Sequence, residues 1–152
     1  MPNRQRRLRL QDYLPYRLSV ATNAVSRLIA RAYESRFALK IPQWRLIAVL
    51  ADEGPLTQQA LCVRTIMDKV TVMRAAQGLL ERGLIRRLPN AQDRRSHRLI
   101  MTAAGQRLYD QIVPMALEYQ ARLLHGMDRA DILQLEQLLR RLEQSAIALS
   151  GG

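Results

Sequence analysis

Basic side chains gather in one stretch of this sequence. Nine arginine or lysine residues and three carboxylates lie between Arg64 and Arg98, in a chain of 152 residues with a formal net charge of +11. A basic surface attracts nucleic acid, and arginine can hold a phosphate or a guanine edge through two parallel hydrogen bonds. The stretch therefore predicts an interface with nucleic acid.

The sequence shows no pattern typical of catalysis or metal binding. Ser-His-Asp triads, paired carboxylates and glycine-rich phosphate loops do not stand out, so we expect no enzyme and no cofactor. His97, His125 and Cys62 are too few and too scattered to predict a zinc site. A single cysteine fits a reducing compartment, and no apolar run reaches the length of a membrane span. We therefore expect a cytoplasmic protein with no membrane partner.

The elements that carry the basic residues are predicted to form a helix-turn-helix. Thr57 is expected to cap one short helix, residues 65–67 form a turn, and Asp68 caps the next helix, which Gly83 ends. The second helix would bury one face, made of Val72, Ala76, Leu79 and Leu80. Its opposite side would face a major groove and holds Lys69, Val70, Thr71, Arg74 and Gln77.

Two residues of this motif have special positions. Cys62 supplies the small residue that is expected to be buried where the two helices cross. Ile66 lies in the turn where glycine is usual, which predicts a strained or different turn. Before the motif, a further helix is expected to open at Pro42 and to stop at Gly54.

A β-hairpin is predicted after the helix-turn-helix. The runs Leu84–Leu88 and His97–Met101 are strand-like, and residues 89–96 between them form a polar loop. Arg94 and Arg95 would project from the loop tip onto the DNA backbone or minor groove, and Asp93 would hold an arginine side chain. Three more arginines could either contact phosphate or lie on a solvated face, and the sequence leaves both roles open. They are Arg82, Arg86 and Arg87.

The regions on either side of this core are predicted to make a dimer. Residues 1–11 form a flexible basic arm, residues 12–40 hold a first helix capped by Asp12, residues 41–101 bind DNA, and residues 102–150 hold two more helices. These last helices are capped by Thr102 and Asp128, with a kink at Pro114. Apolar residues spaced three and four apart line the first and last helices, and a second copy of the chain would cover them.

Three segments resemble the MarR family of bacterial regulators. They are TIMDKVTVMRA at 65–75, LERGLIRR at 80–87 and DRRSHRLIMTAAG at 93–105. The most specific part is Asp93-x-Arg95-Ser96, then a strand, then Thr102-x-x-Gly105. The resemblance spans about residues 12–145 and implies a mainly α-helical winged helix-turn-helix protein. It also implies a homodimer on a palindromic duplex operator, and repression of nearby genes that a small ligand relieves.

The resemblance also implies which residues bind DNA. The contacts of the family's recognition helix fall on Lys69, Thr71, Met73 and Arg74, and those of its wing on Arg94 and Arg95. Met73 departs from the serine common at its position, so it would offer an apolar contact to a thymine methyl group. The resemblance therefore implies DNA binding but does not determine the operator sequence.

An effector pocket is predicted from residue types. Tyr16 and Trp44 would stack on an aromatic acid, Arg17 would bind its carboxylate, and Asn23 would line the same site. Trp44 as an ordinary core residue is the competing interpretation. Two other functions stay open: a regulator switched by oxidation of Cys62, and a nonspecific architectural DNA-binding protein.

Overall fold

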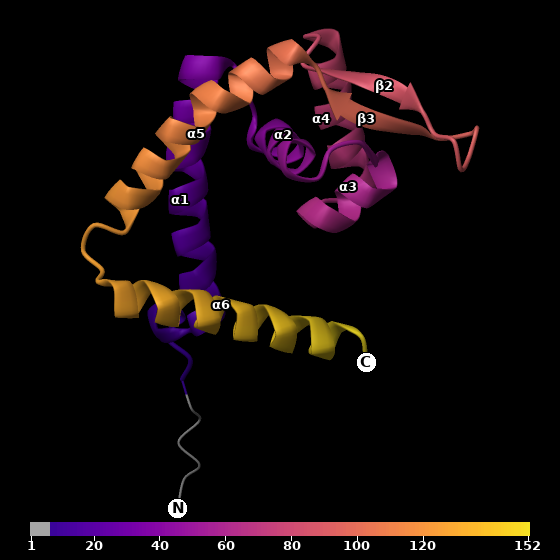
Figure 1. Ribbon diagram of the computed structural model, residues 1–152. Coiled ribbons are helices and arrows are strands. Elements are labelled where there is room, and N and C mark those ends of the chain that lie inside the picture. Colours follow the sequence, from indigo (N-terminus) through magenta and orange to yellow (C-terminus); the bar gives the residue numbers. More distant parts are fainter. Residues whose placement is uncertain (1–6) are drawn as a thin grey trace, which may run out of the picture. The chain divides into compact units, whose positions relative to one another are not determined.

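The computed structural model describes residues 7–152, which are mainly helical with one small antiparallel sheet (Figure 1). The elements are a 3₁₀ turn at Leu10–Asp12, α1 (Leu14–Phe37), α2 (Ile41–Glu53), β1 (Leu56–Thr57), α3 (Gln58–Thr65), α4 (Lys69–Glu81), β2 (Ile85–Pro89), β3 (His97–Met101), α5 (Ala103–Leu123) and α6 (Arg129–Ser150). They divide into two compact units, and the boundary between Tyr109 and Asp110 lies within α5. The predicted fold class is confirmed.

The N-terminal segment differs from its prediction. Residues 1–6 of the expected arm lie outside the described residues, and Leu10–Asp12 form a 3₁₀ turn. Helix α1 begins at Leu14 with Tyr13 as N-cap, so the prediction that Asp12 caps it was wrong. The preceding turn places Asp12 outside the helix, and its Oδ2 lies 3.8 Å from Nε of Arg9. Pro15 occupies the first turn as expected, where its missing N–H costs no hydrogen bond.

Helices α2, α3 and α4 pack together around an apolar core (Figure 1). The largest fully buried side chains of these three helices are Leu46, Ile47, Leu61, Val72 and Leu79. Cys62 was predicted to be buried at the crossing of α3 and α4, but it is only half-buried. Leu61 is the residue that points into the core. Because successive residues are about 100° apart around a helix, the side chain of Cys62 points to one side of the core.

The wing is a three-stranded sheet in the order β1-β3-β2. Strand β3 is central, and its buried Leu99 pairs with Leu56 on one side and Arg87 on the other. The short strand β1 was not predicted. Strand β2 begins one residue later than expected, because the N–H of Leu84 donates to the carbonyl oxygen of Leu79 in the turn after α4.

The joint between the wing and α5 depends on Thr102 and Gly105. The Thr102 hydroxyl accepts a 3.1 Å bond from the Gly105 N–H, which confirms Thr102 as the cap, and donates a 2.6 Å bond to the carbonyl oxygen of Gly83. Its own N–H donates to the carbonyl oxygen of Leu84. A side chain at position 105 would overlap that same Leu84 oxygen. The Thr-x-x-Gly spacing therefore lets α5 begin in close contact with the end of the α4–β2 turn.

The second unit contains the rest of α5 and all of α6. Helix α5 continues through Pro114 to Leu123, and the kink expected at Pro114 stays a prediction. Asp128 caps α6 as predicted, since its Oδ1 accepts a 2.8 Å bond from the Asp131 N–H. None of the residues of α6 is buried, although apolar residues recur every three or four positions along it. The boundaries predicted for the first helix, the DNA-binding region and the last two helices, at residues 40, 101 and 150, stay predictions.

Candidate nucleic-acid interface

The N-terminus of α4 is held by a strong cap. Asp68 accepts a 2.8 Å bond from the N–H of Thr71 and a second 2.8 Å bond from its hydroxyl. These hydrogen bonds, the amide one foremost, lower the pKa of the Asp68 carboxyl. A carboxylate at this end also complements the positive end of the helix dipole. The cap therefore holds the first turn of α4, where the predicted DNA contacts lie, in a fixed conformation.

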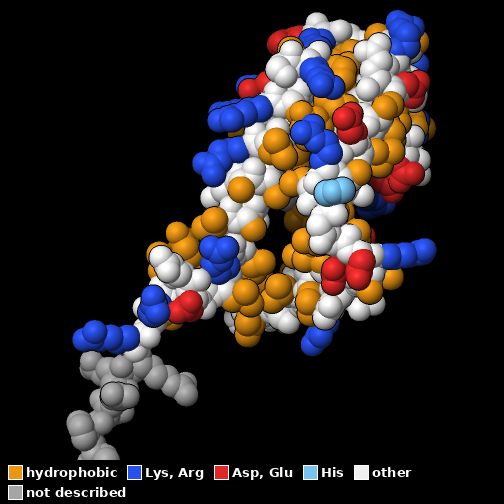
Figure 2. Space-filling view, turned by 90° about the vertical axis from the view of Figure 1, so that its left-hand side faces the viewer, with side chains coloured by type: hydrophobic (Ala, Val, Ile, Leu, Met, Phe, Trp, Pro, Cys, Tyr) orange, Lys and Arg blue, Asp and Glu red, His pale blue; other side chains and the backbone are white. Residues whose placement is uncertain are grey.

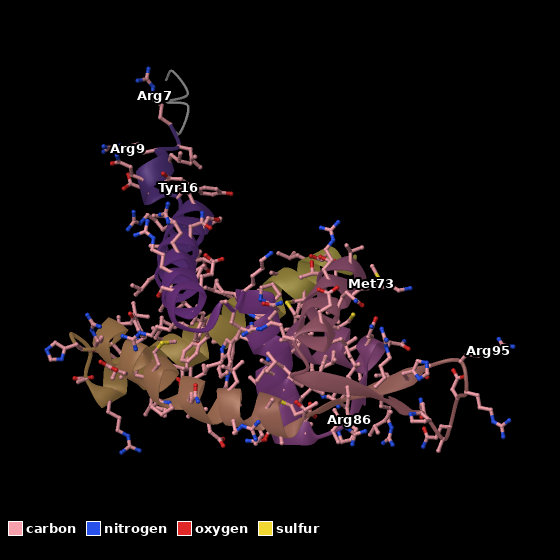
Figure 3. All side chains as sticks on the ribbon, turned by 90° about the horizontal axis from the view of Figure 1, so that it is seen from above. Arg7, Arg9, Tyr16, Met73, Arg86 and Arg95 are labelled. Carbon is pink, nitrogen blue, oxygen red and sulfur yellow. The ribbon has the colours of Figure 1, made fainter. Side chains whose placement is uncertain are left out.

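Helix α4 presents the predicted DNA-binding residues on its exposed side. Its buried side consists of Val72, Ala75, Ala76 and Leu79, which adds Ala75 to the prediction and leaves Leu80 only half-buried. The exposed residues are Lys69, Val70, Met73, Arg74, Gln77 and Glu81, and Figure 3 labels Met73 among them. Thr71 is half-buried and its hydroxyl serves the cap. The helix thus offers two cations, Lys69 and Arg74, that have no ion-pair partner in the described part of the chain.

The wing loop carries two further exposed cations, Arg94 and Arg95. Figure 3 shows Arg95 at the far end of the loop, pointing away from the sheet. Asp93 does not hold an arginine side chain as predicted, because its Oδ1 accepts a 2.9 Å bond from the backbone N–H of Arg95. A short carboxylate closes such a turn locally, which leaves the guanidinium groups free to reach outward. Their contacts with DNA stay predictions.

The three undecided arginines separate into two kinds. The Arg82 guanidinium donates 3.0 Å bonds to the carbonyl oxygens of Phe37 and Ala38, at the end of α1. It therefore satisfies carbonyl groups that a helix end leaves unpaired, and it is less available to a phosphate. Arg86 and Arg87 lie exposed on β2 without an ion pair among residues 7–152. Phosphate contacts remain open to these two.

The turn before α4 is unusual in the way the sequence indicated. Ile66 has φ 55° and ψ 40°, in the left-handed region, and its N–H donates to the carbonyl oxygen of Cys62. A β-branched residue rarely adopts this conformation, and glycine normally takes the position. The Ile66 side chain is also 80% exposed. This strained, apolar residue lies between the two helices of the motif.

The predicted effector residues do not meet within the chain. Tyr16, Arg17 and Asn23 are exposed on the first half of α1, where Figure 3 labels Tyr16. Trp44 instead stacks with Tyr109 at 5.9 Å and 18°, and packs against Tyr33 at 5.5 Å and 37°. Tyr16 and Tyr33 are about 25 Å apart along α1 at the usual helical rise.

Sequence reasoning missed both tyrosines that accompany Trp44. Tyr33 is buried, and burial raises the pKa of its phenol. The three rings come from α1, α2 and α5, so no local spacing connects them.

Within residues 7–152 no cluster of potential metal ligands occurs, and a redox role of the half-buried Cys62 stays a prediction.

The comparisons with known proteins agree with this architecture. Residues 39–96 match the model of the MarR family. The transcriptional regulator FarR of Neisseria gonorrhoeae is 30% identical over 108 residues, which are 71% of this chain and 74% of FarR. The chain belongs to the MarR family. A second relative is the HTH-type transcriptional repressor NicR of Pseudomonas putida, 26% identical over 88% of this chain and 89% of its own length.

The fold of this chain is also similar to that of a solved transcriptional regulator. The crystal structure of a probable transcriptional regulator from Pseudomonas aeruginosa superposes with a TM-score of 0.82 at 28% identity, over 88% of this chain and 99% of that one. This MarR-family protein is accordingly a DNA-binding transcriptional regulator, and the family is not enzymatic. No helix within residues 7–152 is long and apolar enough to cross a membrane.

Proposed function

We propose that this MarR-family regulator is a repressor that binds a palindromic operator as a homodimer and leaves it when a small aromatic acid binds. The exposed cationic surface of α4 and the wing carries the DNA-binding part of this proposal. MarR homologues bind operator DNA and small ligands, and the relative NicR is a repressor. Two-fold symmetry of a dimer would match a palindrome with half-sites about one helical turn apart.

Exposed apolar side chains support the dimer. Along α1 the predicted stripe is open at Leu14, Val25 and Leu28, and Figure 2 shows hydrophobic side chains at the surface near the start of that helix. Along α6 the stripe is open at Leu135, Leu139, Leu142 and Leu149. Helices with a continuous apolar stripe of this spacing bury it against another helix. A second copy of the chain supplies stripes of the same kind.

The DNA contacts predict two different responses to arginine removal. Arg74, one turn into α4, would reach a guanine edge, whereas Arg95 on the wing would bind phosphate. Arg74→Ala should weaken operator binding about tenfold and change which bases matter, since a good bidentate base contact contributes about 1–3 kcal/mol. Arg95→Ala should weaken all duplexes more evenly and flatten the salt dependence of binding, because phosphate contacts release counterions.

Binding to operator and to random duplex at several salt concentrations measures both responses. Arg129→Ala, which removes an exposed cation from the first turn of α6, is the matched control and should change neither quantity. If neither Arg74→Ala nor Arg95→Ala alters affinity by threefold, the assignment of α4 and the wing to DNA is wrong.

The fluorescence of Trp44 can report the binding of the proposed effector. Trp44 is the only tryptophan and lies between two tyrosine rings, so a ligand that reaches this cluster should change its fluorescence. Benzoate and hydroxybenzoates should change Trp44 emission and weaken operator binding at the same concentrations. The coupling expected for an effector, about 1–3 kcal/mol, corresponds to a weakening of about 5- to 150-fold.

Two α1 variants test the predicted carboxylate contact. Arg17 and Trp44 do not meet within one chain, so this contact requires Arg17 of a second copy in the proposed dimer. Arg17→Ala should then raise the ligand concentration needed for both effects, because the charge-assisted bond to the carboxylate is lost. Arg27→Ala removes another exposed arginine from the same helix and should leave the titration unchanged. A screen of aromatic acids that leaves both fluorescence and operator binding unaltered would count against the aromatic effector, but not against DNA binding.

A further inference from the structure

The exposed side of α4 carries two apolar side chains, Val70 and Met73, among charged and polar ones. We infer that Val70 and Met73 select operator half-sites by contacting thymine methyl groups, and that they set the sequence preference together with Arg74. This inference rests on the proposed operator binding by α4. It adds Val70 to the interface and specifies the base chemistry that the helix reads.

Val70 lies on the side of α4 opposite its buried residues. Leu79 is fully buried and lies nine residues after Val70, which is about 180° around the helix at 3.6 residues per turn. Val70 therefore points directly away from the core. By the same geometry Arg74 lies about 40° to one side of Val70 and Met73 about 60° to the other. The side chain at the centre of the exposed face is thus apolar.

The polar residues beside Val70 are already engaged. The Thr71 hydroxyl donates to Asp68 Oδ2 at 2.8 Å, and Gln77 Nε2 donates to Glu81 Oε1 at 3.1 Å. The Thr71 hydroxyl cannot donate to a base without breaking its bond to Asp68, and Gln77 has one of its two N–H groups bound to Glu81. The strongest donors left on this side are the two cations, Lys69 and Arg74, while Gln77 keeps its second N–H and its Oε1. Guanine edges and phosphates suit Lys69 and Arg74, whereas the methyl group of thymine suits the apolar Val70 and Met73.

The apolar side chains of Val70 and Met73 are exposed to solvent. Val70 is 50% exposed and Met73 is 48% exposed, in a segment with an excess of basic residues. A partner for this surface must be polyanionic and must also present apolar groups. Duplex DNA meets both demands in the major groove, where only thymine among the four bases carries a methyl group. Ile66 and Val63, before α4, are also exposed and extend the apolar character of the motif.

Replacement of thymidine by deoxyuridine tests the inference, because it removes the methyl group and keeps every hydrogen-bonding atom. Duplexes that bind the wild-type protein would be selected from a random library and resynthesised with one deoxyuridine at a time. We expect one or two positions in each half-site to lose about fourfold in affinity, the effect of one buried methyl group. Other thymines in the same duplex serve as internal controls.

The protein variants assign the effect to the two side chains. Val70→Ala or Met73→Ala should abolish the loss at its own position, so that thymidine and deoxyuridine bind alike. Arg74→Ala should weaken binding and keep the deoxyuridine effect, which separates methyl contacts from base hydrogen bonds. Because all three side chains are exposed, the circular dichroism and unfolding midpoint of each variant should match the wild type.

The outcomes separate the inference from the proposed function. A protein that selects one duplex sequence but is indifferent to every deoxyuridine binds an operator without methyl contacts, and the inference is then wrong. The inference is equally overturned if the effect persists unchanged in both alanine variants, or if those variants bind DNA normally and lose a protein partner instead. A wild-type protein that selects no sequence over random duplex overturns the proposed operator binding itself.

Discussion

The substitution Leu139→Arg is expected to convert the proposed dimer into a monomer that no longer binds its operator. Leu139 lies near the centre of the apolar stripe on α6 and is 48% exposed in the single chain. In a dimer it would be covered, and an arginine there would bury an unpaired charge. Such a charge costs about 3–5 kcal/mol, enough to raise the dissociation constant of the dimer more than a hundredfold. Sedimentation equilibrium at micromolar concentration measures this change.

A control on the same helix distinguishes the stripe from a general effect of charge. Gln137 is exposed and lies two residues earlier, about 200° around α6, so Gln137→Arg adds the same charge on the opposite side. That variant should remain dimeric and bind operator normally. A well-folded wild-type monomer at micromolar concentration would show that α1 and α6 do not serve dimerisation.

Gly105→Ala is expected to destabilise the fold by about 3 kcal/mol, at the upper end of the cost of overpacking. The added Cβ would overlap the carbonyl oxygen of Leu84, which belongs to the backbone and already accepts the Thr102 N–H. A flexible side chain could move aside, but this carbonyl can move only by shifting the joint between the wing and α5. Urea denaturation should show a lower midpoint with an unchanged slope.

Gly126 offers a matched control for this prediction. A Cβ at position 126 meets nothing within 4 Å, and the residue lies in the turn before α6. Gly126→Ala should therefore leave the free energy of unfolding unchanged, or raise it slightly because alanine restricts the unfolded chain. Equal stabilities of the two variants would mean that the joint tolerates a side chain and that the Thr-x-x-Gly spacing has another cause.

The local features of this protein could be predicted from the sequence because their causes lie within a few residues. Thr57, Asp68, Thr102 and Asp128 all act as predicted N-caps, since each hydrogen bond joins residues three positions apart. The buried side of α4 followed from helical periodicity. The family resemblance added the fold and the DNA-binding role, which the comparisons support. Asp12 failed as a cap because Tyr13 and the preceding 3₁₀ turn offered another start for α1.

The tertiary structure alone decided which distant residues meet. Arg82 bonds to the end of α1 across 44 and 45 residues, Leu56 pairs with Leu99, and Trp44 stacks on Tyr109. Periodicity carries no information about such pairs, because it describes only the faces of single elements. The same holds for the candidate interface. The sequence indicated that Thr71 and Gln77 point outward, but only the structure placed their polar groups in bonds to Asp68 and Glu81, leaving Val70 central and exposed.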